Sequence, residues 1–187
     1  MSIINTPVQP FKVQAFHNGK FIEVTDADLK GQWSVLVFMP AAFTFNCPTE
    51  VEDAADNYAA FQKLEANVYI VTTDSHFAHK VWHETSPAVG KARFPLIGDP
   101  THVLTRMFDV HIEEDGMALR GTFIVNPDGM VKTAEIHDNS IARDMKETLR
   151  KLKAAQYVAK NPGQVCPAKW NEGAKTLTPS LDLVGKI

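Results

Sequence analysis

The chain has 187 residues, 44% of them hydrophobic, which is enough for one well-buried core. Its net charge is -3, from 19 Lys and Arg against 22 Asp and Glu, and the basic residues form no dense run of the kind that binds phosphate groups. A leader-like N-terminus and an apolar run of the roughly 20 residues that span a bilayer are both lacking. The sequence therefore argues against nucleic acid and membrane as partners and predicts a cytoplasmic protein.

The first half of the chain predicts a hairpin followed by a strand, helix and strand. Alternating apolar residues on both sides of Asn18-Gly19 indicate the hairpin, because Asn-Gly favours a tight turn. Two apolar runs indicate buried strands, and apolar residues at three- and four-residue steps between them indicate an amphipathic helix. The ranges are 11–16 and 21–24 for the hairpin, 34–39 and 68–73 for the strands, and 51–64 for the helix, with Pro48 in its first turn. Such a unit is right-handed, with parallel strands.

The second half predicts further layers of the same kind. Capping residues, prolines and apolar periodicity indicate helices that alternate with strands, and Pro127 and Gly129 indicate a second hairpin turn. The ranges are a helix from Asp74 or Ser75 to about Glu84, a strand at 94–99, a helix from Pro100 to Phe108, a loop at 111–119, a hairpin at 122–125 and 130–136, and a final helix at 141–158. This order predicts an α/β domain over residues 1–158, compatible with a thioredoxin-like sheet.

The segment 159–187 differs in character from the rest of the chain. Prolines and glycines interrupt it, so it cannot form one long helix, yet it is too apolar for a free linker. We expect a C-terminal arm that lies across a surface of another subunit.

Cys47 lies between the predicted strand 34–39 and the predicted helix, at or near the helix N-cap. Unpaired backbone N–H groups and the helix dipole favour an anion there, so the position favours a thiolate. Glu50 in the first turn also complements the dipole.

The chain contains only one other cysteine, Cys166. The two are too far apart for a CxxC redox pair and too few for a tetrahedral zinc site. A lasting structural disulfide is uncommon in the cytosol. Either the two are inert buried thiols, which the cysteine count alone favours, or they are a reactive pair brought together by folding or assembly.

Four segments, in order, resemble the two-cysteine peroxiredoxins and, within them, the peroxidase subunits of bacterial alkyl hydroperoxide reductases. The first is Pro40-x3-Thr44-x2-Cys47, within Phe43-Thr44-Phe45-x-Cys47-Pro48-Thr49-Glu50. The second, Val165-Cys166-Pro167-Ala168-x-Trp170, resembles the segment that contains the second cysteine in that group. The other two are residues 152–158 and 179–187. The resemblance covers essentially the whole chain and implies a thioredoxin-like fold.

The resemblance implies a thiol-dependent peroxidase that reduces hydrogen peroxide and organic hydroperoxides to water or alcohols without a cofactor. Cys47 is then the peroxidatic cysteine, which is oxidised to a sulfenic acid. Cys166 of a second subunit is the resolving cysteine, which forms an intersubunit disulfide with it.

The resemblance also assigns supporting roles. Thr44 supplies a hydroxyl to the sulfur or the peroxide, Pro40 shields the pocket from water, and Arg120 supplies a guanidinium to the departing oxygen. Glu50 and Arg143 form an ion pair that holds the carboxylate away from the thiolate. Taken singly, Thr44 could cap the helix, Pro40 could merely end the strand, and Arg120 could be a solvated surface charge.

The implied partners are a second copy of the chain, a ring of five dimers and an electron donor. In the family, the segment 75–78 resembles a contact between dimers. The donor would be a flavin-dependent disulfide reductase or thioredoxin.

Three alternatives stay open. His76, His79 and His83 fall on one face of a predicted helix and could meet a metal, although the family reaction needs none. A cysteine hydrolase would pair Cys47 with a histidine, but the histidines lie in no recognisable partner motif. A holdase ring would use the apolar arm, with or without catalysis.

Overall fold

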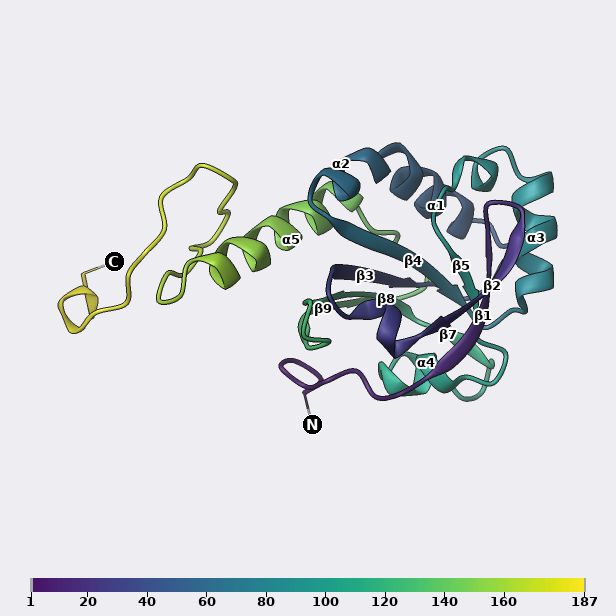
Figure 1. The fold of residues 1–187 in the computed structure, drawn as a ribbon, viewed down its shortest axis with the longest axis horizontal. Helices are drawn as coiled ribbons and strands as arrows, with labels where there is room; N and C mark the ends of the chain where they lie inside the picture. The colour runs from purple at the N-terminus through teal and green to yellow at the C-terminus, as the bar shows by residue number, and fades with distance from the viewer. Residues whose placement is uncertain (1, 187) are drawn as a thin grey trace. The chain divides into compact units, whose positions relative to one another are not determined.

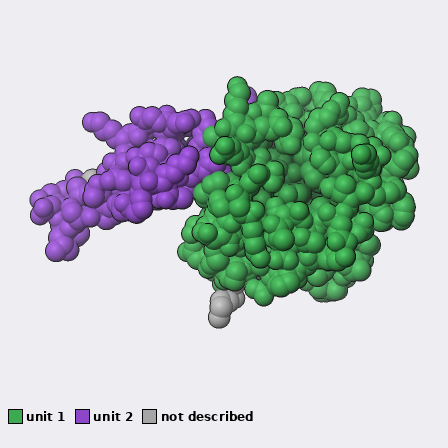
Figure 2. Space-filling model, in the orientation of Figure 1, with its two compact units in different colours: residues 1–145 green, residues 146–187 purple. Residues whose placement is uncertain are grey.

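The computed structural model describes residues 2–186 and forms two compact units (Figures 1 and 2). The first unit ends at Met145 and the second begins at Lys146. Helix α5 (Met145–Lys160) makes up much of the second unit, so the arm expected from residue 159 is only its last part.

The first unit contains a seven-stranded sheet in the order β2-β1-β5-β4-β3-β8-β9. Strand β3 pairs in parallel with β4, which pairs in parallel with β5, and the other pairings in the sheet are antiparallel. The strands are β1 (Lys12–His17), β2 (Lys20–Thr25), β3 (Trp33–Phe38), β4 (Ala66–Thr72), β5 (Leu96–Gly98), β8 (Arg120–Val125) and β9 (Val131–His137). The predicted α/β class, both hairpins and the parallel unit are therefore confirmed.

Helices cover the sheet, and α1 and α2 lie on the side opposite α4 (Figure 1). Their bounds are α1 (Cys47–Asp56), α2 (Tyr58–Lys63), α3 (His76–Thr85) and α4 (Val103–Met107). All six residues of β3 are buried, as its unbroken apolar run requires. Leu36 and Phe38 of β3 join Leu104 of α4 and Phe108 in one apolar cluster. The sheet thus places the C-terminal end of β3, and the loop that follows it, against a rigid core.

Two predicted helices in the first unit differ in extent. The helix expected at 51–64 is divided at Asn57, whose side-chain amide donates to Asp53 O (2.8 Å) and Asp53 Oδ1 (2.9 Å), because asparagine competes with the backbone for hydrogen bonds. Pro100 does not begin α4. The left-handed residue His102 (φ 60) precedes that helix, which starts at Val103.

The expected loop at 111–119 contains a short hairpin, β6 (His111–Ile112) and β7 (Met117–Ala118). Its turn contains Gly116 at φ 63, a conformation that glycine adopts without strain. The final helix begins at Met145 rather than Ile141. Ile141 is 57% exposed, and the Asp53 carboxylate accepts the Met145 N–H at 2.8 Å, satisfying a free donor of the first turn.

The second unit folds its tail back on α5. Trp170 is 2% exposed, packs at a tilt of 50° against Tyr157 with ring centroids 5.2 Å apart, and donates from its indole to Ala174 O (3.1 Å). Val165 and Leu177 pair as an isolated antiparallel bridge. The segment is therefore an ordered arm. That it lies on the surface of another subunit stays a prediction. Within residues 2–186, no helix has both the length and the apolar character needed to cross a membrane.

Candidate active site

Cys47 is the first residue of α1, directly after the N-cap residue Asn46, and its side chain is fully buried. Pro48 therefore occupies the second helical position, within the first turn as expected. Proline loses no hydrogen bond there, since the first turn has no intrahelical partners for its N–H groups. The sulfur thus lies at the positive end of a ten-residue helix, where an anion is favoured.

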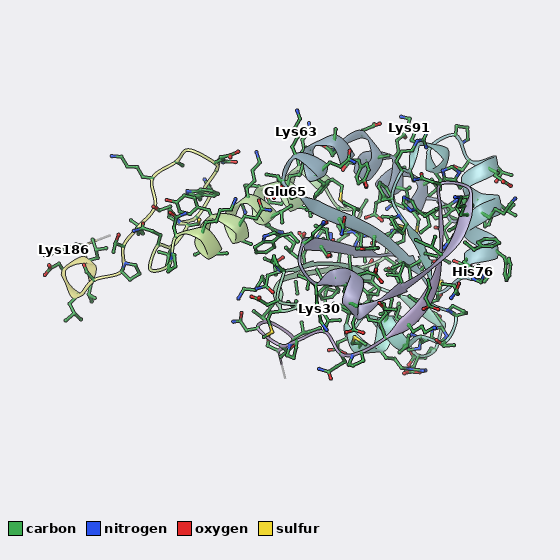
Figure 3. The ribbon with its side chains drawn as sticks, viewed as in Figure 1. Lys30, Lys63, Glu65, His76, Lys91 and Lys186 are labelled. Atoms are coloured by element: carbon green, nitrogen blue, oxygen red, sulfur yellow. The ribbon has the colours of Figure 1, made fainter. Side chains whose placement is uncertain are left out.

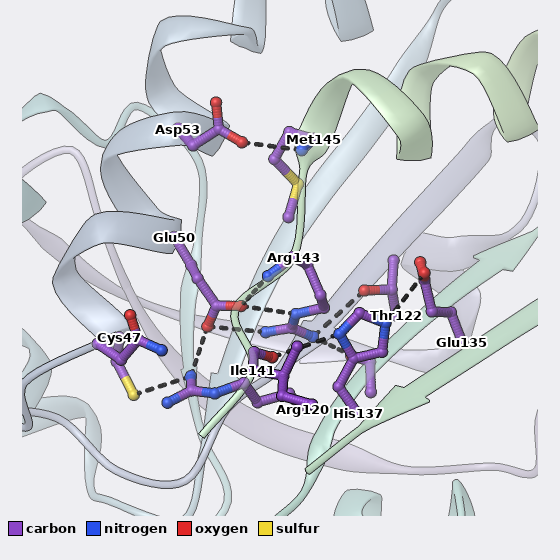
Figure 4. A network of polar contacts seen from close by, with 12 residues as sticks. Cys47, Glu50, Asp53, Arg120, Thr122, Glu135, His137, Ile141, Arg143 and Met145 are labelled. Carbon is purple, nitrogen blue, oxygen red and sulfur yellow. Dashed lines mark hydrogen bonds and ion pairs between the residues drawn. The ribbon is translucent and has the colours of Figure 1, made fainter. Parts of the chain in front are cut away.

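Arg120 lies at the start of β8, beside the C-terminal end of β3, and its guanidinium lies next to Cys47 (Figure 4). Its Nη1 is 3.4 Å from Cys47 Sγ, and its Nε donates to Asn139 O at 2.9 Å. The side chain is 3% exposed, so the alternative of a solvated surface charge is wrong. The bond to Asn139 fixes the guanidinium fork in place, and nothing in the sequence pattern indicated it.

Glu50 lies one turn after Cys47 and binds two arginines. Its Oε1 accepts from Arg143 Nε (2.8 Å) and the Arg143 backbone N–H (3.0 Å), and its Oε2 accepts from Arg120 Nη1 (2.5 Å). The expected ion pair between Glu50 and Arg143 is present. Glu50 also pairs with Arg120, which the sequence did not predict. Two buried guanidinium groups face one buried carboxylate, so one positive charge remains beside the sulfur. This surplus can stabilise the negative charge that develops on an oxygen leaving the site.

The loop before Cys47 contains the other two predicted residues. Pro40 is buried, and its carbonyl accepts a hydrogen bond from Thr73 Oγ1 (3.3 Å). The Thr44 hydroxyl donates to Ala41 O (3.1 Å), so in this state its hydrogen is held by the loop. Thr44 is not the helix cap, since that position belongs to Asn46.

Cys166 belongs to the second unit and is partly buried, with Sγ 4.0 Å from Ala154 O. Both cysteines are free thiols. Burial raises the pKa of the Cys166 thiol, and the nearby Arg150 acts in the opposite direction. Cys166 is therefore kept mainly as a thiol at neutral pH.

The histidines of α3 do not converge on one point. His79 is fully buried, with Nε2 2.8 Å from Thr72 Oγ1 and Nδ1 3.1 Å from Leu96 O. The ring of His83 contacts a backbone carbonyl, and His76 lies at the periphery against aromatic rings (Figure 3). Among residues 2–186, no three His, Cys, Asp or Glu side chains are grouped as metal ligands.

We expect His79 to make stability fall in mild acid. Burial lowers the pKa of His79 from 6.5 to about 4. Between pH 6.5 and pH 4 the unfolded chain therefore binds a proton at this residue, whereas the folded chain does not. The free energy of unfolding should drop by about 3 kcal/mol from this group as the pH falls through that window. Urea titrations at pH 7 and pH 4.5, on the wild type and His79→Gln, measure the difference. An equal pH dependence in both proteins would contradict the prediction.

Comparisons with known proteins agree with this geometry. Residues 4–134 match the family described as "AhpC/TSA family", and residues 154–186 match the "C-terminal domain of 1-Cys peroxiredoxin". The chain is 77% identical to "Alkyl hydroperoxide reductase C" of Pseudomonas aeruginosa over 187 residues, which is 100% of both chains.

Solved structures give the same fold. Enterococcus faecalis AhpC is 43% identical with a TM-score of 0.87, and the match covers 89% of this chain and 100% of that one. The reduced Plasmodium vivax 2-Cys peroxiredoxin is 26% identical with a TM-score of 0.92, covering 97% and 96%. The predicted thioredoxin-like fold is confirmed. With its cysteine at a helix start and its matches along both units, the chain belongs to the AhpC/TSA family of peroxiredoxins.

Proposed function

We propose that this protein is a thiol-dependent peroxidase that reduces hydrogen peroxide and organic hydroperoxides, with the Cys47 thiolate as the attacking group. The observation that carries the proposal is the buried Cys47 sulfur at the start of α1, 3.4 Å from the Arg120 guanidinium. A peroxide needs a soft nucleophile on one oxygen and a hydrogen-bond donor near the other. Cys47 and Arg120 supply these two groups side by side.

In the first step, the sulfur forms a bond to the terminal peroxide oxygen while the O–O bond breaks. Sulfur is oxidised to the sulfenic state, and the proton of the attacked peroxide oxygen passes to the departing oxygen, which leaves as water or alcohol. The sulfenate then takes a proton from solvent to become the sulfenic acid. Arg120 stabilises the charge that develops on that oxygen, and its bond to Glu50 holds it for this purpose. Pro40 keeps water from the sulfur, and the Thr44 hydroxyl, whose own hydrogen stays on Ala41 O, accepts a hydrogen bond from the peroxide.

In the second step, the Cys166 thiol of a partner subunit attacks the sulfenic acid and water leaves, producing a disulfide. Bridged Cα atoms lie within about 7 Å of each other. Cys47 is enclosed in a helix start, so we infer that the first turn of α1 unwinds and the arm is released before the bond forms.

After peroxide treatment, non-reducing gel electrophoresis should show a covalent dimer in the wild type. Cys166→Ser should remain a monomer, because its oxidised Cys47 lacks a thiol partner. Reduction of the sample before loading is the control. A wild type that stays monomeric after oxidation would reject the intersubunit scheme.

The working assembly we propose is a homodimer that forms a ring of five dimers, with Ser75 to Ala78 at the contact between dimers. The disulfide must be reduced again in every cycle, so we place the protein in the reducing cytoplasm. A flavin-dependent disulfide reductase or thioredoxin would supply the electrons.

Rapid mixing with hydrogen peroxide tests the function itself. Trp82 is buried and its ring lies 6.2 Å from Phe43 in the loop before Cys47, so tryptophan fluorescence should report the oxidation. We expect a fast change in the wild type and none in Cys47→Ser.

Two outcomes would point to other functions. Retained ester hydrolysis without peroxide consumption would favour a cysteine hydrolase. Retained chaperone activity in Cys47→Ser would show that a holdase function does not need the reaction of Cys47 with peroxide.

A further inference from the structure

We propose that Asp74 is a positioning residue for the reaction of Cys47, held in place by Thr72 and His79. This inference rests on the proposed peroxidase function and adds to it a partly buried support for the loop before Cys47. Neither Asp74 nor Thr72 forms a hydrogen bond with the Cys47 sulfur in the described part of the chain.

Asp74 holds the backbone of the loop. Its Oδ2 accepts the Ala42 N–H at 2.6 Å, and the neighbouring Thr73 hydroxyl donates to Pro40 O at 3.3 Å. Two consecutive residues of the β4–α3 turn therefore bind the residues on either side of Ala41. The Ala41 carbonyl in turn accepts from the Thr44 hydroxyl. The turn thus sets where the pocket residue Thr44 is anchored.

Asp74 is partly buried and is itself fixed by a chain of hydrogen bonds that leads to the buried side chains of Thr72 and His79. The Thr72 hydroxyl donates to the same Asp74 Oδ2 at 2.7 Å, and the Asp74 N–H donates back to Thr72 Oγ1 at 3.2 Å. Because the Thr72 proton is given to Asp74, a singly protonated His79 ring donates from Nε2 to Thr72 Oγ1 (2.8 Å), and its Nδ1 lies 3.1 Å from Leu96 O. Thr72 and His79 are both 0% exposed. A side chain anchored at each step has few alternative rotamers, which is what precise positioning needs.

Gly98 at the end of β5 is a second, independent indication that the turn is fixed, because the backbone of residues 74–76 packs directly against it. A Cβ at this position would lie 2.7 Å from both Asp74 O and His76 N, so any larger residue must displace the backbone of the turn. Gly98→Ala should therefore move Asp74 while leaving every polar group of the network in the sequence.

The consequence for the reaction is selective. A loosened loop misplaces the peroxide pocket but leaves the Cys47–Arg120–Glu50 contacts, which come from α1 and β8, intact. Attack on peroxide needs that pocket, whereas alkylation by iodoacetamide needs mainly an accessible thiolate. Misplacement of a reacting group by about 1 Å can cost on the order of a hundredfold in rate.

The test compares Thr72→Val, Thr72→Ser, Asp74→Ala and Gly98→Ala, all in a Cys166→Ser background so that Cys47 is the only thiol. Stopped-flow fluorescence measures the rate constant with hydrogen peroxide, and mass spectrometry measures the rate of iodoacetamide alkylation. We expect Thr72→Val, Asp74→Ala and Gly98→Ala to lose about tenfold or more in the peroxide reaction and less than about twofold in alkylation. Thr72→Ser keeps the hydroxyl and should recover most of the peroxide rate.

Thr105→Val is the matched control. Thr105 is also a buried threonine of the first unit, but its hydroxyl has no hydrogen-bond partner among the described residues, so the peroxide rate should not change. Unchanged peroxide rates in the test variants, an equal loss in both reactions, or a Thr72→Ser rate as low as that of Thr72→Val would each overturn the inference. A slow peroxide reaction in the background protein carrying only Cys166→Ser would instead refute the proposed function.

Discussion

Replacing Arg120 with methionine is expected to slow the reaction of Cys47 with hydrogen peroxide by about 10²- to 10³-fold, the usual effect of removing a donor aimed at developing charge. Arg120 Nη1 lies 3.4 Å from the sulfur, and the guanidinium provides the surplus positive charge of the site. Glu50 keeps its contacts with Arg143, so the variant has a balanced buried pair and should fold. Stopped-flow fluorescence under pseudo-first-order conditions measures the rate constant.

Two further variants define the origin of this effect. Arg120→Lys keeps the charge but not the planar fork that contacts Cys47, Glu50 and Asn139 at once, so only part of the rate should return. Arg106→Met removes an exposed arginine paired with Glu113 and should leave the rate unchanged. If Arg120→Met reacted within threefold of the wild type, Arg120 would have no part in the chemistry.

Glu50→Gln is expected to destabilise the protein by about 3–5 kcal/mol, because it leaves two buried guanidinium groups without their common carboxylate. The Arg120 and Arg143 side chains are 3% and 1% exposed, so water cannot replace the lost charge. For a chain of this length the loss corresponds to a fall of about 10 °C in Tm. Denaturant titration of the reduced protein gives the free energy of unfolding directly.

A double variant tests the charge argument. Glu50→Gln with Arg143→Met removes one cation along with the anion, so it should be less destabilised than the sum of the two single changes. Glu113→Gln, at an exposed ion pair, should have no measurable effect. Additive losses, or a loss for Glu50→Gln no larger than that for Glu113→Gln, would show that Glu50 does not hold the two arginines.

Local features of the chain were predictable because they depend on neighbouring residues. The all-buried strand β3, the hairpin at Asn18-Gly19 and the start of α1 at Cys47 follow from apolar periodicity and from turn and helix-start residues. The break at Asn57 was missed because one side-chain bond competed with a continuous apolar face. The late start of α5 was missed because Ile141 matches the helical period but is exposed.

By itself, then, the sequence determined the α/β order and the position of a lone thiol at a helix start, and its motifs indicated the peroxidase family. Only the tertiary structure decided what surrounds that thiol. The joint hold of Arg120 and Arg143 on Glu50, and the chain from His79 through Thr72 and Asp74 to Ala42, connect residues of separate strands and helices. No periodicity or spacing encodes such contacts, because they arise only when the sheet brings the C-terminal ends of β3 and β4 and the start of β8 together.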